Sequence, residues 1–316
     1  MIQTDVLIVG GGPAGSACAK RLGELGVDCL ILDKQTFPRA KPCAGWITPE
    51  VFQHLGVNPG DYPHGLTHFD TFQVSIKGIR FRLSTHQYAI RRLEFDAWLL
   101  DLAGADLIQH QVVKIERAQN GFIIDDAYQG NYLVGAGGTH CPVRKQLFRQ
   151  PSENREKGLI LAKEAEFNYP VSETRCHLWF FEDRLPGYAW YVPKADGVLN
   201  IGIGASASGL QRRGRTLNGY WEQHLDRLAK MELLGDAAVA PSGHSYLLNQ
   251  SPQPQQSGRV FLVGDSLGMA TRDMGEGIGP ALQSGILAAE AIQTRSSLDT
   301  RPIPRLSFPS LFGWRK

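Results

Sequence analysis

Three glycines near the N-terminus have the spacing of a turn that holds a pyrophosphate. Gly10, Gly12 and Gly15 follow the apolar run of residues 6–9 and precede a segment with helical periodicity. The first glycine permits a tight turn, the second lets the backbone approach a phosphate, and the third lets helix and strand pack closely. The helix start offers unpaired N–H groups and a positive dipole to the phosphates. The alternative is a glycine-rich turn without a ligand.

An acidic residue stands where such a site needs a hydrogen-bond acceptor. Asp33 follows a second apolar run, residues 29–32, after the predicted helix. A carboxylate at the end of this strand can accept hydrogen bonds from ribose hydroxyls, and it disfavours a 2′-phosphate. The acid therefore favours NAD or FAD as the dinucleotide.

A second glycine-rich element, far along the chain, favours FAD over NAD. Asp265 follows the apolar run of residues 260–263, and Gly277 and Ile278 stand at the start of a helical pattern. A carboxylate here can accept from the ribityl chain of a flavin. The helix start can direct N–H groups to the flavin's pyrimidine edge, where negative charge develops on reduction. An NAD site needs no such distant element, so the sequence predicts FAD.

Three further residues are candidates for catalysis. Cys43 lies in a Pro-Cys-Ala-Gly turn after the basic residues Arg39 and Lys41. Nearby cations favour a thiolate, so this residue is a candidate reactive thiol or proton donor beside the flavin. The alternative is a small residue packed under the ring. Tyr188 and Trp190 alternate along a predicted strand and so share one face, where they either wall a cavity for an apolar ligand or pack within the sheet.

The apolar patterns predict two kinds of sheet. Fully apolar runs near both ends of the chain are typical of buried parallel strands, whereas residues 72–83 and 159–203 alternate as antiparallel strands do. Residues 16–25, 93–102 and 278–292 have helical periodicity. The predicted fold class is α/β with an antiparallel sheet, namely a Rossmann-like FAD-binding domain with an inserted antiparallel-sheet substrate domain.

The nucleotide domain is predicted to be discontinuous, because strands of parallel character flank the antiparallel region. The expected FAD-binding domain comprises residues 1–70, 88–158 and 250–295, the expected substrate domain comprises residues 71–87 and 159–249, and residues 296–316 form an irregular tail. The tail mixes Phe, Leu and Trp with Arg and Lys over residues 308–316. We expect a frayed terminus there, with contact to a membrane surface as the alternative.

Composition argues against several classes of protein. The net charge of +2 is too small for a nucleic-acid surface, and the five Cys residues have no paired spacing that would indicate a disulfide framework. No apolar run approaches the ~20 residues that span a bilayer. The nine His residues show no metal-ligand spacing. We expect a cytoplasmic protein without a metal, with peripheral membrane contact left open.

In order along the chain, several stretches resemble the geranylgeranyl reductase family of FAD-dependent oxidoreductases, within the para-hydroxybenzoate-hydroxylase-like group. The stretches are residues 5–15, the Lys-Pro-Cys-Ala-Gly of 41–45, the Arg-Leu-Glu-Phe-Asp of 92–96, residues 135–138 with 142–144, the Gly-Tyr-Ala-Trp-Tyr-Val-Pro of 187–193, and residues 263–265 through 288–291. Three positions depart from the family pattern: Gly137 replaces an acid, Val192 an aromatic residue and Met274 a small polar residue.

The resemblance implies a role for each cofactor-binding candidate. The ADP half would contact Gly10, Gly12, Pro13, Ala14, Gly15, Asp33 and Lys34, with the backbone near Val112 facing the adenine and Arg92 near the pyrophosphate or the ribityl chain. The flavin half would contact Lys41, Cys43, Ala44, Asp265, Gly277 and Ile278.

Three functions are compatible with these residues. The leading hypothesis is that reduced FAD delivers a hydride to a carbon–carbon double bond of an apolar, isoprenoid-like or lipid substrate, with Cys43 or water giving the proton. NADPH or a ferredoxin would supply the electrons. The second hypothesis is a flavin monooxygenase or halogenase-like enzyme on an aromatic or apolar substrate, with Lys41 as the lysine to test. The third is a non-catalytic flavin electron carrier.

Overall fold

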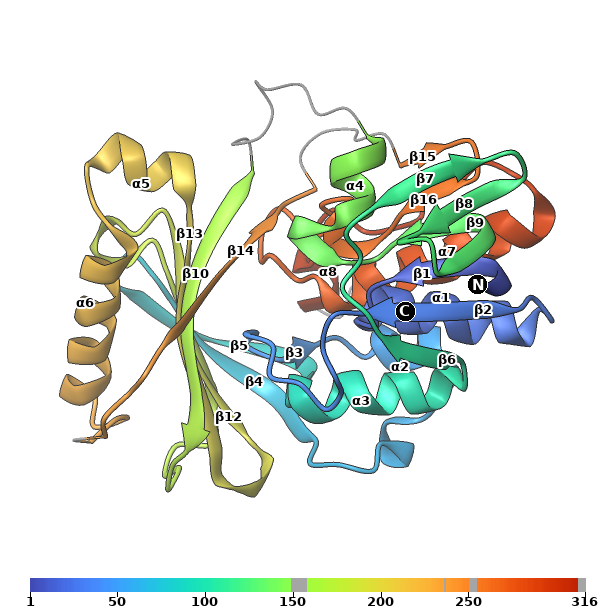
Figure 1. The fold of residues 1–316 in the computed structure, drawn as a ribbon. Helices are drawn as coiled ribbons and strands as arrows, with labels where there is room; N and C mark the ends of the chain where they lie inside the picture. The colour runs from blue at the N-terminus through green and yellow to red at the C-terminus, as the bar shows by residue number, and fades with distance from the viewer. Residues whose placement is uncertain (149–157, 236, 250–254, 312–316) are drawn as a thin grey trace.

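The chain folds into two lobes, each built around an eight-stranded sheet (Figure 1). The computed structural model describes residues 1–148, 158–235, 237–249 and 255–311. The first sheet gathers strands from the two ends and the middle of the sequence, and the second gathers the intervening strands. Neither lobe is therefore a continuous piece of chain.

The first sheet has the topology of a dinucleotide-binding fold. Its strands are β1 (Ile2–Val9), β2 (Cys29–Asp33), β6 (Asp106–Gln109), β7 (Ile115–Ala118), β8 (Gly121–Ile124), β9 (Tyr128–Gly135), β15 (Gln256–Ser257) and β16 (Val260–Leu262). The order β16-β9-β1-β2-β6 is parallel throughout, which confirms the predicted parallel character of β1, β2 and β16. Val6, Leu7 and Ile8 have no exposed surface, as expected for a central strand that is covered on both faces.

The helices of this lobe are α1 (Pro13–Glu24), α2 (Glu50–Leu55), α3 (Arg92–Ala103), α4 (Pro142–Leu147) and α7 (Ile278–Thr294). α1, α3 and α7 pack on one face of the sheet, α4 and the β7–β8 strands cover the other face, and α2 packs against the helices. The three predicted helices are confirmed, and α1 begins earlier than expected because Pro13 suits the first helical position. α1 packs closely on α7, since a Cβ at Gly285 would lie 2.1 Å from the carbonyl oxygen of Ala14.

The second sheet is antiparallel with one exception. Its strands are β3 (Trp46–Ile47), β4 (Thr67–Ile76), β5 (Ile79–Ala89), β10 (Leu159–Asn168), β11 (Cys176–Phe180), β12 (Gly187–Lys194), β13 (Val198–Ser206) and β14 (Ser242–Leu247). The order is β14-β10-β13-β12-β11-β4-β5-β3, and β11 pairs with β4 in parallel. The antiparallel expectation is wrong for this pair, because a long crossover rather than a hairpin joins the two strands.

Two further helices, α5 (Ala207–Arg213) and α6 (Leu217–Lys230), lie on the outer side of the second sheet (Figure 1). Lys77 and Gly78 connect β4 to β5 with positive φ values of 49° and 87°. Gln119 and Asn120 form the turn between β7 and β8, and Gly121 is already the first residue of β8.

The tail is more ordered than we expected. Residues 308–311 form a short helix, α8 (Phe308–Leu311), instead of fraying. The Asp273 carboxylate accepts hydrogen bonds from the N–H groups of Ser307 and Phe308 at its start, and Leu311 is buried. These contacts hold the segment to the body of the protein, and residues 312–316 lie outside the described residues.

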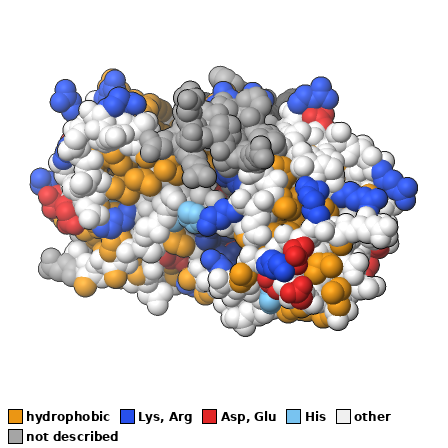
Figure 2. All heavy atoms as spheres, turned by 45° about the horizontal axis from the view of Figure 1, so that its top comes forward, with side chains coloured by type: hydrophobic (Ala, Val, Ile, Leu, Met, Phe, Trp, Pro, Cys, Tyr) orange, Lys and Arg blue, Asp and Glu red, His pale blue; other side chains and the backbone are white. Residues whose placement is uncertain are grey.

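Between the lobes lies a depression in which Lys and Arg side chains gather on the face that Figure 2 shows. Throughout the described ranges, no helix combines the length and the apolar character needed to cross a bilayer.

Candidate functional site

The glycine turn is packed too closely to accept side chains at Gly10 and Gly15. Gly10 has φ +113°, and a Cβ there would lie 2.5 Å from the Ala136 carbonyl oxygen. A Cβ at Gly15 would lie 1.9 Å from the Gly10 carbonyl oxygen, so the helix start packs directly on the strand end. At Gly12 the nearest atom to such a Cβ is Nη2 of Arg39, at 3.4 Å. The turn therefore brings backbone and a guanidinium to one small region.

Asp33 lies at the carboxyl end of β2, as the sequence predicts, and it is nearly buried. Its Oδ2 accepts from the N–H of Gly11 at 2.8 Å, and its Oδ1 accepts from the N–H of Gln35 at 2.9 Å. Each carboxylate oxygen can accept a further hydrogen bond. This position suits a ribose hydroxyl beside the glycine turn.

Arg39 is a candidate phosphate ligand that the sequence reasoning used only as a charge near Cys43. Its guanidinium stacks on the Phe37 ring at 4.7 Å and pairs with Asp96 at 3.4 Å. Its buried Nε has no hydrogen-bond partner among the described residues. A guanidinium that lies next to Gly12 through Nη2 and has an unpaired Nε–H fits an anionic ligand such as a pyrophosphate.

Arg92 is held at a fixed position next to Cys43. Its Nε and Nη2 donate to the two carboxylate oxygens of Asp96 at 2.7 and 2.8 Å. Burial opposes the charge of this guanidinium, but the carboxylate of Asp96 and the nearby Cys43 outweigh burial and raise the pKa of Arg92. The predicted cofactor residue Arg92 is therefore a permanent buried cation at the site.

Opposite charges also meet at the second glycine-rich element. Burial lowers the pKa of Lys41, with Arg92 adding to the effect and Asp265 opposing it. Burial raises the pKa of Asp265, opposed by the same two cations. A Cβ at Gly277 would lie 3.6 Å from Oδ1 of Asp265, so this carboxylate sits at the start of α7 where Ile278 begins the helix. The structure thus joins Lys41, Asp265, Gly277 and Ile278 as predicted.

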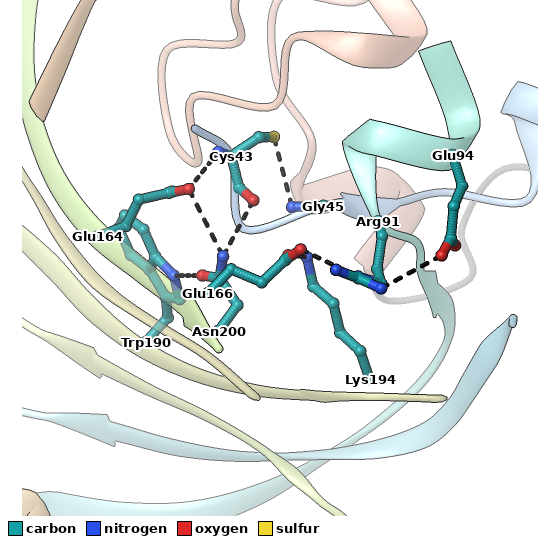
Figure 3. Close-up of polar contacts among 9 residues, drawn as sticks. All are labelled: Cys43, Gly45, Arg91, Glu94, Glu164, Glu166, Trp190, Lys194 and Asn200. Carbon is teal, nitrogen blue, oxygen red and sulfur yellow. Dashed lines mark hydrogen bonds and ion pairs between the residues drawn. The ribbon is translucent and has the colours of Figure 1, made fainter. Parts of the chain in front are cut away.

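Two residues of the second sheet hold the backbone of Cys43 in place by hydrogen bonds (Figure 3). Its N–H donates to Oε1 of Glu164 on β10, and its carbonyl oxygen accepts from Nδ2 of Asn200 on β13 at 3.2 Å. Oδ1 of Asn200 accepts in turn from Nε1 of Trp190 at 2.8 Å. The sulfur points away from Glu164 and accepts from the N–H of Gly45 at 3.3 Å (Figure 3). The network fixes the direction of the thiol.

Glu164 is a buried acid that the sequence reasoning missed. Burial raises the pKa of its carboxyl to about 7, although the Lys194 ammonium and the hydrogen bonds from Cys43 and Asn200 oppose the shift. Its Oε2 is buried and has no hydrogen-bond partner among the described residues. Lys194 itself pairs with Glu166, which Arg91 also contacts at 3.1 Å (Figure 3).

Tyr188 and Trp190 lie on the same face of β12, as predicted. The Tyr188 hydroxyl donates to the carbonyl oxygen of Met274 at 2.6 Å, and its ring stacks on Phe180 at 5.2 Å. Trp190 is buried beneath the Cys43 loop. Trp179, in contrast, packs in the core on the opposite face of the sheet, against His224. The aromatic run of residues 179–181 therefore does not line one cavity.

The remaining predicted residues are less closely tied to the site. Pro13 and Ala14 are buried in the first turn of α1, and Ala44 packs against the apolar face of the second sheet. Lys34 is exposed just after β2, and Val112 lies between β6 and β7 against the core. Their contacts with the cofactor stay predictions. In the described ranges, no group of three or more His, Cys, Asp and Glu side chains is arranged to hold a metal ion.

Comparison with known protein families identifies the nucleotide. Residues 3–93 match a family model described as an FAD binding domain. The glycine turn, the unpaired Nε of Arg39 and the acid at Asp33 are in this region and fit that cofactor. The prediction of FAD is therefore confirmed.

Curated relatives extend over nearly the whole chain. An uncharacterized protein of Methanosarcina barkeri is 31% identical over 93% of this chain and 76% of its own length. A menaquinone reductase of Mycobacterium tuberculosis is 27% identical over 99% of this chain and 80% of its own. A digeranylgeranylglycerophospholipid reductase of Methanosphaera stadtmanae is 25% identical, with coverages of 93% and 79%.

Solved structures share the fold. A geranylgeranyl bacteriochlorophyll reductase-like protein of Thermoplasma acidophilum matches with a TM-score of 0.79 at 20% identity, covering 93% of this chain and 79% of that chain. A flavin-dependent brominase matches with a TM-score of 0.71 at 17% identity, with coverages of 93% and 79%. The predicted fold class is confirmed, and the same fold serves more than one chemistry.

We expect Gly12→Ala to weaken FAD binding without unfolding the protein. The added methyl group meets no backbone atom closely, but it occupies the approach to the pyrophosphate. The dissociation constant for FAD should rise at least about tenfold, measured by flavin fluorescence on adding FAD to apoprotein. Gly23→Ala is the matched control, because nothing lies within 4 Å of a Cβ at that position of the same helix. Equal FAD affinity in both variants would contradict the assignment.

We expect Glu164→Gln to become more stable relative to the unmodified protein as pH rises. The pKa of this carboxyl is about 7 in the folded protein and lies above its ordinary value of 4.5. The stability that the neutral carboxyl contributes is therefore fully present below pH 4.5 and is lost as the pH rises through 7. Ionisation costs roughly 3 kcal/mol, which the amide avoids. Thermal midpoints measured from about pH 5 to about pH 8 test this. Glu222→Gln, at an exposed position, is the control. If the difference in thermal midpoint between Glu164→Gln and the unmodified protein did not change with pH, Glu164 would not titrate in this range.

Proposed function

Because this chain belongs to the geranylgeranyl reductase family of FAD-dependent oxidoreductases, we propose that it reduces carbon–carbon double bonds of an apolar, isoprenoid-like substrate. The reduced cofactor, when bound, supplies the hydride for such a reaction. The names of two relatives, a menaquinone reductase and a digeranylgeranylglycerophospholipid reductase, support a substrate with an isoprenoid chain.

One contact carries the proposal. The Tyr188 hydroxyl donates to the Met274 carbonyl, which directly precedes the glycines that lead to Gly277 and α7. This hydrogen bond joins the aromatic face of the second sheet to the flavin-binding element. Aromatic and aliphatic walls beside a redox cofactor suit an apolar ligand and keep water away from the reacting carbon.

Cys43 is the proposed proton source, with water as the alternative. Its backbone is fixed by Glu164 and Asn200, and its sulfur accepts a hydrogen bond from the N–H of Gly45. A proton donor must be held at a set position to act in the transition state, and the hydrogen bonds to the Cys43 backbone support such a role. Addition of the hydride to one carbon and of this proton to the other would complete the reduction.

The electron donor is also a proposal. The sequence carries one glycine motif of the pyrophosphate type, at residues 10–15. NADPH would therefore reduce the flavin by transient binding, or a ferredoxin would deliver electrons at the protein surface.

Anaerobic mixing tests the reaction. We expect protein reduced with dithionite and mixed with a geranylgeranyl lipid to regain oxidised flavin absorbance without oxygen, with a product heavier by two hydrogen atoms per reduced bond. Reoxidation only on admitting air, with oxygen found in the product, would favour a monooxygenase. Rapid electron transfer to an acceptor protein with no product would favour an electron carrier.

We expect Cys43→Ala to slow this anaerobic reoxidation by roughly a hundredfold while FAD stays bound, since loss of a general acid typically costs that much or more. The control is Cys29→Ala, which changes a partly buried thiol on β2 within the core. Unchanged reoxidation in Cys43→Ala would assign the proton to water.

A further inference from the structure

Four large apolar side chains are exposed together at one corner of the second sheet. Ile76, Ile79 and Phe81 flank the β4–β5 turn, and Phe181 follows β11. Their exposed fractions are 38%, 72%, 42% and 50%. The N–H of Lys77 donates to the Phe180 carbonyl at 3.2 Å, so the turn and the end of β11 are neighbours. We call residues 76–82 and Phe181 the hairpin tip.

Phe181 is kept at the surface at a conformational cost. Its φ is +58°, a left-handed conformation that a bulky residue rarely adopts. Its N–H donates to the Gly187 carbonyl at 3.0 Å, which stabilises the turn. Strain of this kind persists where the surrounding structure imposes it, and it is concentrated at functional positions.

Three cations alternate with the apolar residues of the hairpin tip. Lys77, Arg80 and Arg82 are exposed, and none of them forms an ion pair within the described part of the chain. The neighbouring Glu182 accepts hydrogen bonds from the Ser75 hydroxyl at 2.7 Å and from the Gly78 N–H at 2.8 Å, and it keeps its negative charge. The three cations exceed this one acid, so the hairpin tip carries an excess of positive charge.

The apolar side of the hairpin tip is continuous with the candidate substrate wall. Strand pairing places Ile76 opposite Ile79 on β5 and opposite Phe180 on β11, so these side chains share one face. Phe180 stacks on Tyr188, whose ring lies 5.6 Å from that of Trp190. An unbroken series of aliphatic and aromatic side chains thus leads from the surface to the flavin site.

We propose that the hairpin tip docks this protein on an anionic lipid bilayer. Ile79, Phe81 and Phe181 enter the boundary between headgroups and acyl chains, while the three cations contact anionic headgroups. Docking would bring the site to substrates that are held in a membrane, and this purpose rests on the proposed function. The test of docking does not depend on turnover.

Charge favours a bilayer over a second copy of the chain as the occupant. A symmetric dimer through the hairpin tip would bring Lys77, Arg80 and Arg82 face to face with the same residues of the other copy. Like charges in such a contact oppose association, whereas an anionic bilayer neutralises them.

Vesicle sedimentation tests the docking with FAD-loaded protein and no substrate. We expect the protein to bind vesicles of phosphatidylcholine with phosphatidylglycerol, and to bind those of phosphatidylcholine alone more weakly. Ile79→Ser should reduce the partition coefficient at least about tenfold, and Arg80→Gln roughly fivefold with a weaker dependence on salt.

Two matched variants control for general effects. Val113 has the same exposed fraction as Ile79, 72%, but lies in the other lobe, and Lys145 is an exposed cation on α4. Val113→Ser and Lys145→Gln should bind vesicles as the unmodified protein does.

Absence of vesicle binding, or equal binding by Ile79→Ser, would overturn the proposal. A dimer in sedimentation velocity that Ile79→Ser dissociates, without vesicle binding, would assign the surface to a second copy. If the protein reduced a lipid anaerobically but bound no vesicles, the proposed function would hold and membrane docking would be excluded.

Discussion

The close approach of α1 to both β1 and α7 is the constraint on which the site depends. Side chains at Gly15 and Gly285 would collide with carbonyl oxygens at 1.9 and 2.1 Å, so the three elements meet backbone to backbone. This contact brings the N-terminus of α1 and the start of α7 to the same edge of the first sheet. Because parallel strands end at that edge, Asp33 and Asp265 reach it as well.

Charge is balanced locally around this edge. Asp96 pairs with two guanidinium groups, those of Arg39 and Arg92, while Lys41 faces Asp265. Arg39, whose guanidinium lies beside Gly12, is the cation of this group placed to pair with a bound diphosphate. The second sheet contributes the ion pair between Lys194 and Glu166 and the carboxyl of Glu164, which accepts a hydrogen bond from the Cys43 backbone.

The nucleotide site was predictable because its signals are local. Glycine spacing and an acid at a strand end encode the turn directly, and the structure brings these residues together. Glu164 was not predictable, because its partner Cys43 lies 121 residues away and an acid in an alternating strand is normally typical of a solvent-facing side. The parallel pairing of β11 with β4 and the anchoring of α8 by Asp273 are likewise set by contacts between distant segments. Sequence periodicity carries no information about such contacts.

The interleaved order of the strands has a consequence for biosynthesis. β1 pairs along its length with β9, and β9 pairs with β16, so the sheet that begins at Ile2 is completed only when residue 262 is available. The α7 half of the flavin site comes later still, from Ile278 onward. A nascent chain on the ribosome therefore exposes the glycine turn long before it can retain a flavin, and loading of the cofactor belongs to the end of synthesis.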